Sequence, residues 1–226
     1  MGGDFYDFLD RKDGRLRLLV GDATGKGVPA ALVMSTTCGM LRAVSQASEY
    51  SPGEVLERVN EALCPNTPPN MLVTCFYGIL ESSSSSFTYA NAGHDLPYVH
   101  HDGGAEELKA RGMPLGLMPG IGYEEKEVIL EVNDSVLFYS DGLVEAHDPK
   151  GEMFGFPRLR ALVAQHGGQR SLGEFLMEEL YSFTEEGWEQ EDDITLLTLR
   201  RSANRSRTSG NTPTRRLVEQ GPRIGV

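Results

Sequence analysis

The sequence has little cysteine and no long apolar run. Its 226 residues include only three cysteines, Cys38, Cys64 and Cys75, and no C-x-x-C pair, so neither a disulfide framework nor a structural zinc site is predicted. No window approaches the ~18 consecutive apolar residues of a membrane span, and no basic segment leads into an apolar stretch at the start. We therefore expect a cytoplasmic protein with no membrane partner.

Positive charge is also scarce, except near the C-terminus. The formal net charge is −12, and the chain from Ser202 onward carries five arginines against one glutamate, a local +4, which leaves −12 − 4 = −16 for the rest. Such an acidic body repels nucleic-acid backbones, which are bound through Lys and Arg. We predict no nucleic-acid partner, one folded domain over 1–200, and a disordered basic tail over 201–226.

Two segments partly match nucleotide-binding motifs, but each lacks a feature that its motif requires. GKGVPA at 25–30 matches the dinucleotide pattern G-x-G-x-x-A, but three residues separate it from the preceding strand and no series of βαβ units follows. GDATGKG at 21–27 has three residues between its first two glycines, where a P-loop needs four, and glycine follows the lysine where Ser or Thr is needed. We therefore predict no nucleotide cofactor.

The apolar pattern predicts strands in adjacent runs and helices in pairs. Such grouping favours antiparallel sheets covered by helices over a doubly wound parallel sheet. Two capping boxes, Ser51 with Glu54 and Ser171 with Glu174, mark helix starts. The predicted elements are a hairpin over 3–22 that turns at 12–14, helices over 29–46 and 52–63, strands within 71–102, a strand pair over 126–132 and 135–140 that turns at 133–134, helices over 157–165 and 171–183, and a last strand over 194–200.

Aspartates stand where predicted strands meet loops: Asp4, Asp22, Asp141, and the pair Asp192 and Asp193. Strand ends are fixed by the sheet yet open to solvent, so carboxylates from distant parts of the chain can converge there on one rigid site. Converging carboxylates repel each other unless a cation is present, and oxygen ligands without His or Cys favour Mg2+ or Mn2+. The alternative is that each aspartate only hydrogen-bonds its own turn.

Seven segments occur in the order found in the metal-dependent serine/threonine phosphatases of the 2C type (PPM). They are GGDFYD, VGDATGKGVPAALVM, NAGHDLPYV, MPLGLMPG, FYSDGLVEA, GEMFGFPRL and DDITLLTL. The chain most resembles the bacterial branch typified by the sporulation stage II E phosphatase and the stress-response sigma-factor regulators, over Gly2 to about Arg200. The resemblance implies an α+β fold, a four-layer αββα sandwich of two antiparallel β-sheets flanked by helix pairs, in agreement with the pattern above.

The resemblance also implies a site with two Mn2+ or Mg2+ ions. Asp22 corresponds to the bridging carboxylate, and the carbonyl of Ala23 is a further ligand. Asp141 and Asp192 correspond to the carboxylates that complete the site. Asp193 corresponds to a residue that contacts the metal ligands from outside, and Asp4 corresponds to an acidic position that contacts metal directly or through water.

The implied function is a metal-dependent protein phosphatase that hydrolyses phosphoserine or phosphothreonine on an anti-anti-sigma-type regulator in a partner-switching pathway. Phosphate monoesters need accelerations approaching ~10²¹, far beyond the ~10²–10⁴ of one acid or base, so metal-activated water carries the chemistry. Two alternatives stay open: a non-catalytic phosphoprotein-binding module of this fold, and a metal-dependent hydrolase of small phosphoesters. A homodimer also stays open.

Some features fall outside the metal ligands. His94 in NAGHDLP is either a general acid or a hydrogen-bonded structural residue, and Lys26 either helps to hold phosphate or is an exposed loop lysine. Glu145 is interpreted as structural. Family members have a strand before GGD, and sensor domains or regulators commonly precede the module, so we expect a catalytic domain without its first strand. In related phosphatases the helices expected at 29–46 and 52–63 form a movable element.

Overall fold

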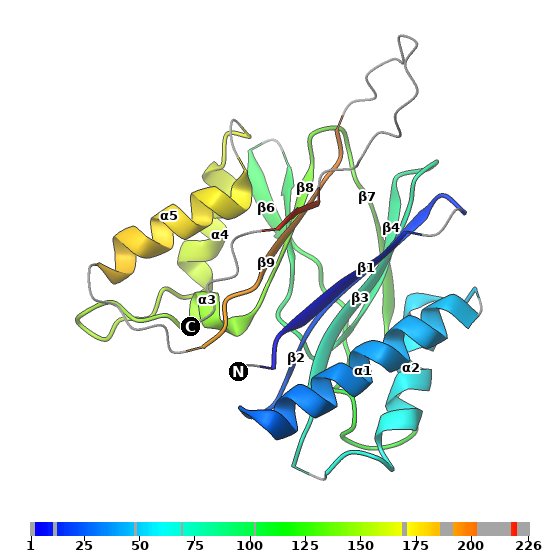
Figure 1. Cartoon of the computed structure of the whole chain (residues 1–226). Helices are drawn as coiled ribbons and strands as arrows, with labels where there is room; N and C mark the ends of the chain where they lie inside the picture. The colour runs from blue at the N-terminus through cyan, green and yellow to red at the C-terminus, as the bar shows by residue number, and fades with distance from the viewer. Residues whose placement is uncertain are drawn as a thin grey trace, which may run out of the picture.

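Two five-stranded antiparallel sheets pack face to face between pairs of helices in the computed structural model (Figure 1). The structure describes residues 3–10, 13–47, 49–68, 70–101, 103–168, 171–185, 192–202 and 218–220. Sheet A has the order β1-β2-β3-β4-β7, and sheet B has the order β10-β9-β8-β5-β6. The strands of sheet A are β1 (Phe5–Asp10), β2 (Arg15–Ala23), β3 (Val73–Glu81), β4 (Ser86–Ala92) and β7 (Glu125–Ile129); those of sheet B are β5 (Tyr98–His101), β6 (Gly104–Glu107), β8 (Ser135–Tyr139), β9 (Leu196–Arg200) and β10 (Val218–Gln220).

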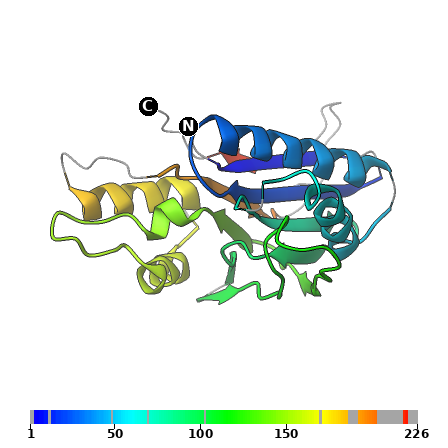
Figure 2. The same cartoon turned by 90° about the horizontal axis from the view of Figure 1, so that it is seen from below.

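The helices cover the outer faces of the two sheets, which gives the expected four-layer αββα arrangement (Figure 2). The helices α1 (Val28–Ala47) and α2 (Pro52–Leu63) pack on sheet A, whereas α4 (Phe156–Gln165) and α5 (Leu172–Thr184) pack on sheet B. A one-turn helix, α3 (Asp141–Val144), follows β8 directly. The fold class predicted from the sequence is confirmed.

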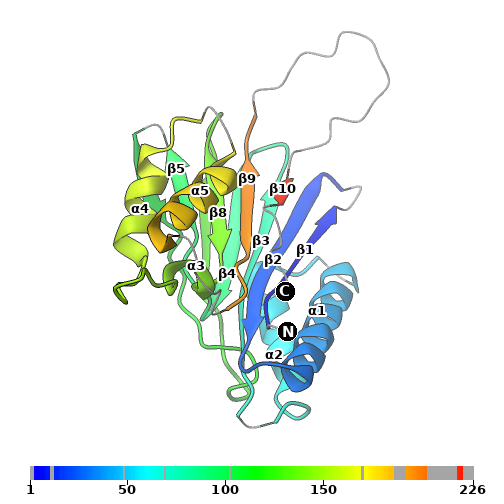
Figure 3. The same ribbon diagram turned by 60° about the vertical axis from the view of Figure 1, so that its left-hand side comes forward.

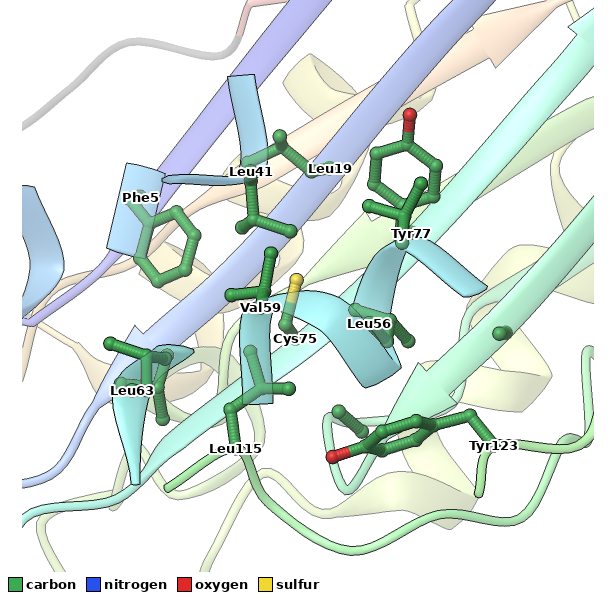
Figure 4. Close-up of a cluster of buried hydrophobic side chains, with 14 of the residues drawn as sticks. Phe5, Leu19, Leu41, Leu56, Val59, Leu63, Cys75, Tyr77, Leu115 and Tyr123 are labelled. Atoms are coloured by element: carbon green, nitrogen blue, oxygen red, sulfur yellow. The ribbon is translucent and has the colours of Figure 1, made fainter. Parts of the chain in front are cut away.

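The side-chain alternation along β2 explains why a central sheet has apolar residues on both faces. Leu18 and Val20 point to the space between the sheets, where they join Phe76 of β3 and Phe138 of β8. Leu19, between them in sequence, points the other way and packs under α1 and α2 with Cys75, Tyr77, Leu41 and Val59 (Figure 4). Period-two alternation thus gives one strand two cores.

Helix α1 is the only helix in the described part of the chain that is long and apolar enough to cross a membrane. It has 20 residues and a mean hydropathy of 1.2 over its best window, of which 22% is buried. Its inner side packs on sheet A through Leu41, Val33 and Val44. Arg42 of α1 also forms an ion pair with Asp7 of β1 in the same sheet, at 2.6 Å. These contacts are those of a helix that covers a sheet.

One predicted helix cap is confirmed and one is wrong. At the start of α2, Ser51 accepts from the backbone of Glu54, and the Glu54 carboxylate accepts from the backbone N–H of Ser51. At the start of α5 the side chain of Ser171 makes no capping hydrogen bond, although the helix starts where the pattern predicts. A serine with glutamate three residues later marks the boundary, but the reciprocal bonds also need the right rotamers.

The predicted hairpin of 126–132 and 135–140 is wrong in its pairing. A tight turn does form, because the Asp134 carboxylate accepts from the Glu131 N–H at 2.6 Å and Asn133 has φ +78°. However, β7 pairs with β4 in sheet A, and β8 pairs with β5 and β9 in sheet B. The turn therefore connects a strand of sheet A to a strand of sheet B. Leu130, which follows β7, is buried in the core between the two sheets.

Three described elements were not predicted from the sequence: β6, α3 and β10. The last of them lies within 201–226, the segment for which a disordered tail is expected. Val218–Gln220 pair antiparallel with Leu197–Leu199 of β9, because the outer edge of β9 offers unpaired backbone groups. These three residues thus form a strand within the segment that the sequence predicts to be a disordered tail. Arg201 and Ser202 also lie within the described residues, and 203–217 and 221–226 lie outside them.

Candidate functional site

The end of β2 leads into α1 and the end of β8 leads into α3, and these two junctions lie at the same end of the sheets (Figure 1 and Figure 3). Asp22 belongs to the first junction, and Asp141 begins α3. Phe5 pairs with Gly21, and the N–H of Ala23 donates to the carbonyl of Gly3 at 3.2 Å, so Asp4 and Asp22 lie side by side in sheet A. In sheet B, Tyr139 pairs with Leu196, which brings the residue after β8, Ser140, next to the approach to β9. Each sheet therefore presents acidic residues at the same end.

Hydrogen bonds join the two halves of this site. The hydroxyl of Thr195, just before β9, donates to Oδ2 of Asp4 at 2.7 Å, which connects sheet B to the start of β1. The N–H of Thr195 donates to the hydroxyl of Ser140 at 2.9 Å, and that hydroxyl donates to the carbonyl of Asp193 at 3.3 Å. Thr195 and Ser140 thus fix Asp4 against the segment that carries Asp192 and Asp193.

The carboxylates repel one another, and burial makes that repulsion stronger. Burial first, and then the charges of Asp4, Asp141 and Asp192, raise the pKa of Asp22 to about 7. Burial also raises the pKa of Asp4 to about 6, against the lowering effect of the neighbouring hydroxyls of Ser140 and Thr195. The pKa of Asp141 rises because of burial and Asp192. Carboxyl groups with raised pKa values in one place are typical of functional sites.

Turn aspartates elsewhere in the chain behave in the opposite way. Asp148 accepts hydrogen bonds from the N–H groups of Lys150 and Glu152, both at 2.8 Å. These bonds, that from Glu152 first, lower its pKa. Asp22 and Asp141 instead have raised pKa values, so local turn hydrogen bonding does not account for their positions. The observation favours a shared site over the alternative that each aspartate serves only its own loop.

Lys26 is the cation nearest to the cluster among the described ion pairs. Its Nζ lies 3.1 Å from Oδ2 of Asp192, with 63% of the lysine side chain and 44% of the aspartate side chain exposed. The loop that carries Lys26 leads from β2 into α1, and Gly25 and Gly27 both have positive φ there. An exposed pair of this kind contributes little to stability, but it leaves a lysine at the edge of the site.

The sequence argument missed Asp95, which follows His94 at the crossover between the sheets. Its Oδ2 is buried and has no hydrogen-bond partner within the residues that the structure describes. Burial, then Asp141 and Glu145, raise its pKa to about 6. Asp95 also comes shortly after a strand, β4, so the rule that selected the other aspartates applies to it. Its position inside NAGHDLP drew attention to the histidine instead.

His94 is buried and neutral. It is 7% exposed, and its Nδ1 lies 2.9 Å from the hydroxyl of Thr74. Burial lowers its pKa to about 4, against a smaller raising effect of the backbone of Tyr139. A histidine that is neutral throughout the physiological range and has little solvent access is a poor proton donor. The structure therefore favours the structural interpretation of His94.

The donors at this site are those that Mg2+ or Mn2+ prefers. They are carboxylate oxygens, from Asp4 and Asp22 on sheet A and from Asp141 and Asp192 next to β8 and β9 of sheet B. Within the described ranges, no three His, Cys, Asp or Glu side chains already form the tight group that encloses a metal ion. The raised pKa values of Asp22 and Asp4 show that positive charge would relieve the repulsion. The residue set therefore fits a divalent cation.

Close backbone approach holds the Asp141 turn against the segment before β9. A Cβ built on Gly142 would lie 2.2 Å from the carbonyl oxygen of Asp193, far inside a normal contact. A Cβ on Gly3 would similarly lie 2.1 Å from the carbonyl oxygen of Ala23 and 2.4 Å from Oδ1 of Asp22. Both glycines are needed because the backbone itself fills the space beside the carboxylates.

We expect Gly142→Ala to destabilise the protein by ~1–3 kcal/mol, because the added methyl overpacks against the Asp193 carbonyl. In a domain of this size this lowers Tm by about 2–4 °C per kcal/mol. Thermal melting followed by circular dichroism measures the change. The matched control is Gly39→Ala in α1, where a Cβ meets nothing within 4 Å and where Tm should rise slightly. Equal melting of wild type and Gly142→Ala would contradict this close approach.

The family of the chain follows from comparison with known proteins. The model of the family described as stage II sporulation protein E (SpoIIE) matches residues 12–202, which include β2 to β9 and four of the five aspartates. The chain belongs to the SpoIIE family. The resemblance to this family is thus confirmed, and so is the two-sheet fold that it implied.

Relatives of this SpoIIE-family chain include a phosphoserine phosphatase and a domain described as PP2C. "Phosphoserine phosphatase RsbU" of Bacillus subtilis is 30% identical over 205 residues, which are 89% of this chain and 60% of RsbU. A crystal structure of the RsbU and RsbW domains of Rv1364c from Mycobacterium tuberculosis superposes with a TM-score of 0.73 at 31% identity, covering 90% of this chain and 58% of that one. The SiaA-PP2C domain of Pseudomonas aeruginosa superposes with a TM-score of 0.76 at 25% identity, covering 88% and 80%. The chain thus spans about 60% of the length of RsbU.

Proposed function

We propose that this SpoIIE-family chain is a Mn2+- or Mg2+-dependent protein phosphatase that hydrolyses phosphoserine or phosphothreonine. The observation that carries the proposal is the gathering of Asp4, Asp22 and Asp141 from both sheets, with raised pKa values that mutual charge contributes to. The 30% identity to a phosphoserine phosphatase supports the reaction. We also propose that the reaction takes place in the cytoplasm, in keeping with the three free cysteines.

The proposed site would hold two divalent cations. Asp22 and the carbonyl of Ala23 would hold them from sheet A, and Asp141 and Asp192 would hold them from sheet B. Such ions would supply an activated water and positive charge for the phosphoryl oxygens. Asp4, which accepts a hydrogen bond from Thr195, would bind directly or through water, and Asp193 would support the ligands through its backbone contacts.

The remaining residues prepare the site for a phosphate group. Lys26, at the start of α1, lies at the end of a helix where backbone N–H groups and the helix dipole attract anions. No described cysteine is suited to act as a nucleophile, because burial raises the pKa of Cys38 and Cys64, and that of fully buried Cys75 still further. Hydrolysis by an activated water, without a phosphoenzyme, fits this set of residues.

The proposed substrate is a phosphorylated anti-anti-sigma-type protein in a partner-switching pathway. One similar structure combines an RsbU domain with an RsbW domain, and RsbU itself is named for phosphoserine. The relatives are longer than this chain, so we also propose that a regulatory domain or partner controls the activity. An acidic body with net charge −16 before Ser202 agrees with a protein substrate and not with nucleic acid.

The test is hydrolysis by the purified chain with Mn2+, with Mg2+ and with EDTA. Two substrates are compared, p-nitrophenyl phosphate and an anti-anti-sigma protein phosphorylated by its kinase. We expect turnover of both only with divalent metal, and a much higher kcat/KM for the phosphoprotein. Turnover of the small ester alone would favour a small-phosphoester hydrolase. Mn2+ binding and phosphoprotein binding without turnover would favour a binding module.

A further inference from the structure

Three large apolar side chains are exposed on the segment that leads from β6 to β7. Met113 is 50% exposed, Leu117 42% and Met118 49%. Single exposed apolar residues are common on protein surfaces, but apolar residues gathered in one place mark a surface that another molecule covers. We call these three side chains the apolar rim. No Asp, Glu, Lys or Arg interrupts it, since the residues from 112 to 122 include none.

The backbone under the apolar rim is fixed, so its side chains stay outside. Leu115, in the middle of the segment, is fully buried in the core beneath α2 (Figure 4). Its N–H donates to the carbonyl of Val73 at 2.8 Å, and the N–H of Val73 donates back at 3.1 Å. Fully buried Asn60 of α2 donates from Nδ2 to the carbonyl of Met118 at 2.8 Å and accepts at Oδ1 from the N–H of Gly116 at 2.9 Å. A surface that is already ordered has less conformational freedom to lose when a partner binds.

The same backbone contacts place the apolar rim close to Asp22. Val73 pairs with Ala23 in the register of β2 and β3, and it also bridges to Leu115. Ala23, Val73 and Leu115 are therefore three successive members of one ladder. Neighbouring members of a ladder lie ~5 Å apart, which puts the backbone of Leu115 about 10 Å from that of Ala23. A protein whose phosphorylated residue reaches the aspartates thus also lies over the rim.

Charge also favours approach over this part of the surface. The chain before Ser202 carries a net charge of −16, and each phosphate group on a partner adds about −1.5 to −2. The segments 62–80 and 112–122, which contain Val73 and Leu115, have no Asp, Glu, Lys or Arg. A phosphoprotein that approaches over these segments meets less like charge, and it gains affinity from apolar area that leaves water.

We propose that Met113, Leu117 and Met118 form a docking surface for the protein substrate and bind apolar side chains around its phosphoserine or phosphothreonine. The proposal rests on the proposed function and deepens it, because it gives a reason for preferring a phosphoprotein to a small phosphoester. The small ester reaches only the aspartates, whereas the protein also covers the rim. Methionine suits this role because its flexible side chain adapts to irregular apolar surfaces and is enriched at interfaces.

The test replaces the rim by polar side chains of similar size, in the triple variant Met113→Gln, Leu117→Gln and Met118→Gln. The substrates are p-nitrophenyl phosphate and an anti-anti-sigma protein phosphorylated by its kinase, both with saturating Mn2+. We expect KM for the phosphoprotein to rise ~10-fold or more with little change in kcat, because the variant loses apolar contacts and binding must remove water from the amides. Both constants for p-nitrophenyl phosphate should stay within twofold of wild type. Binding of the phosphoprotein in EDTA, followed by surface plasmon resonance, should weaken by a similar factor.

The matched control is Ile129→Gln. Ile129 is also 50% exposed and apolar, but it pairs with Ser86 at the start of β4. The other end of β4, at Ala92, pairs with Cys75 near the aspartates, so Ile129 lies at the opposite end of sheet A. Ile129→Gln should leave the kinetic constants for both substrates and the affinity for the phosphoprotein unchanged.

The outcomes separate docking from other roles of the segment. A phosphoprotein KM and affinity within twofold of wild type in the triple variant would overturn the proposal. An equal loss of kcat/KM for p-nitrophenyl phosphate would also overturn it, because the segment would then act on the aspartates themselves. A wild type that sediments as a dimer, with a triple variant that sediments as a monomer, would overturn it by showing that a second copy covers the rim.

Failure of the proposed function gives a different result. A wild type that binds the phosphoprotein without hydrolysing it would refute the proposed function, while the affinities of wild type and triple variant still decide on the rim. A wild type that hydrolyses p-nitrophenyl phosphate but neither binds nor hydrolyses the phosphoprotein would overturn both.

Discussion

Asp141→Asn should abolish metal-dependent hydrolysis of p-nitrophenyl phosphate, with kcat falling ~10³-fold or more. Asp141 begins α3 directly after β8, and its raised pKa reflects burial and the neighbouring charge of Asp192. The amide keeps the size of the side chain but removes the negative charge that would hold a divalent cation. A loss of about 4 kcal/mol of transition-state stabilisation corresponds to this factor. Steady-state kinetics with Mn2+, paired with calorimetric Mn2+ titration, measures both consequences.

The matched control is Asp148→Asn, seven residues along the chain. Asp148 accepts backbone hydrogen bonds from Lys150 and Glu152 in its own turn, and its pKa is lowered by them. Its loss should cost some stability but leave kcat for the folded protein within about twofold. If Asp141→Asn retained metal-dependent turnover, Asp141 would not be a ligand. The proposed ion site between the sheets would then have to be built without it.

The fold was predictable because its determinants are local. Period-two alternation in β2, the apolar stripe of α2 and the Ser51–Glu54 cap each indicate an element without knowledge of its partners. The pairing of 126–132 with 135–140 was wrong for the same reason. A tight turn at Asn133 and Asp134 looks the same in a hairpin as between strands of different sheets, and only the burial of Leu130 between the sheets decides.

The parts of the candidate site that could be predicted are the aspartates at strand ends, because that position is visible in the sequence. The contacts between residues distant in the sequence could not be predicted. Asp4, Asp22 and Asp141 were found because each stands where a predicted strand meets a loop, and in the structure Asp22 is the last residue but one of β2. The contact of His94 with Thr74 and the hydrogen bond from Thr195 to Asp4 depend on how the strands and sheets pack, and they join residues that are 20 and 191 positions apart in the sequence. Neither spacing has a signature in a single sequence.

Without metal, the protein should become less stable as pH rises, and Asp22→Asn should remove much of this dependence. The pKa of Asp22 is about 7 and that of Asp4 about 6 in the folded protein, both above the ~3.9 of an unfolded aspartate. Between about pH 4 and 7 the folded state therefore binds more protons. The free energy of unfolding consequently falls as pH rises through that window. His94 acts in the opposite sense below about pH 6.5, because its folded pKa is lowered.

Comparing wild type with Asp22→Asn at each pH cancels the His94 contribution, since both proteins contain it. In EDTA at pH 7.5 we expect Asp22→Asn to melt several degrees higher than wild type, because the amide relieves repulsion from Asp4, Asp141 and Asp192. At pH 5, where the wild-type carboxyl is mostly protonated, the two should melt together. Saturating Mn2+ should reverse the order at pH 7.5, since only wild type gains binding energy. A lower Tm for Asp22→Asn in EDTA at pH 7.5 would show that the carboxylates do not repel one another, and the electrostatic argument for a cation site would fail with it.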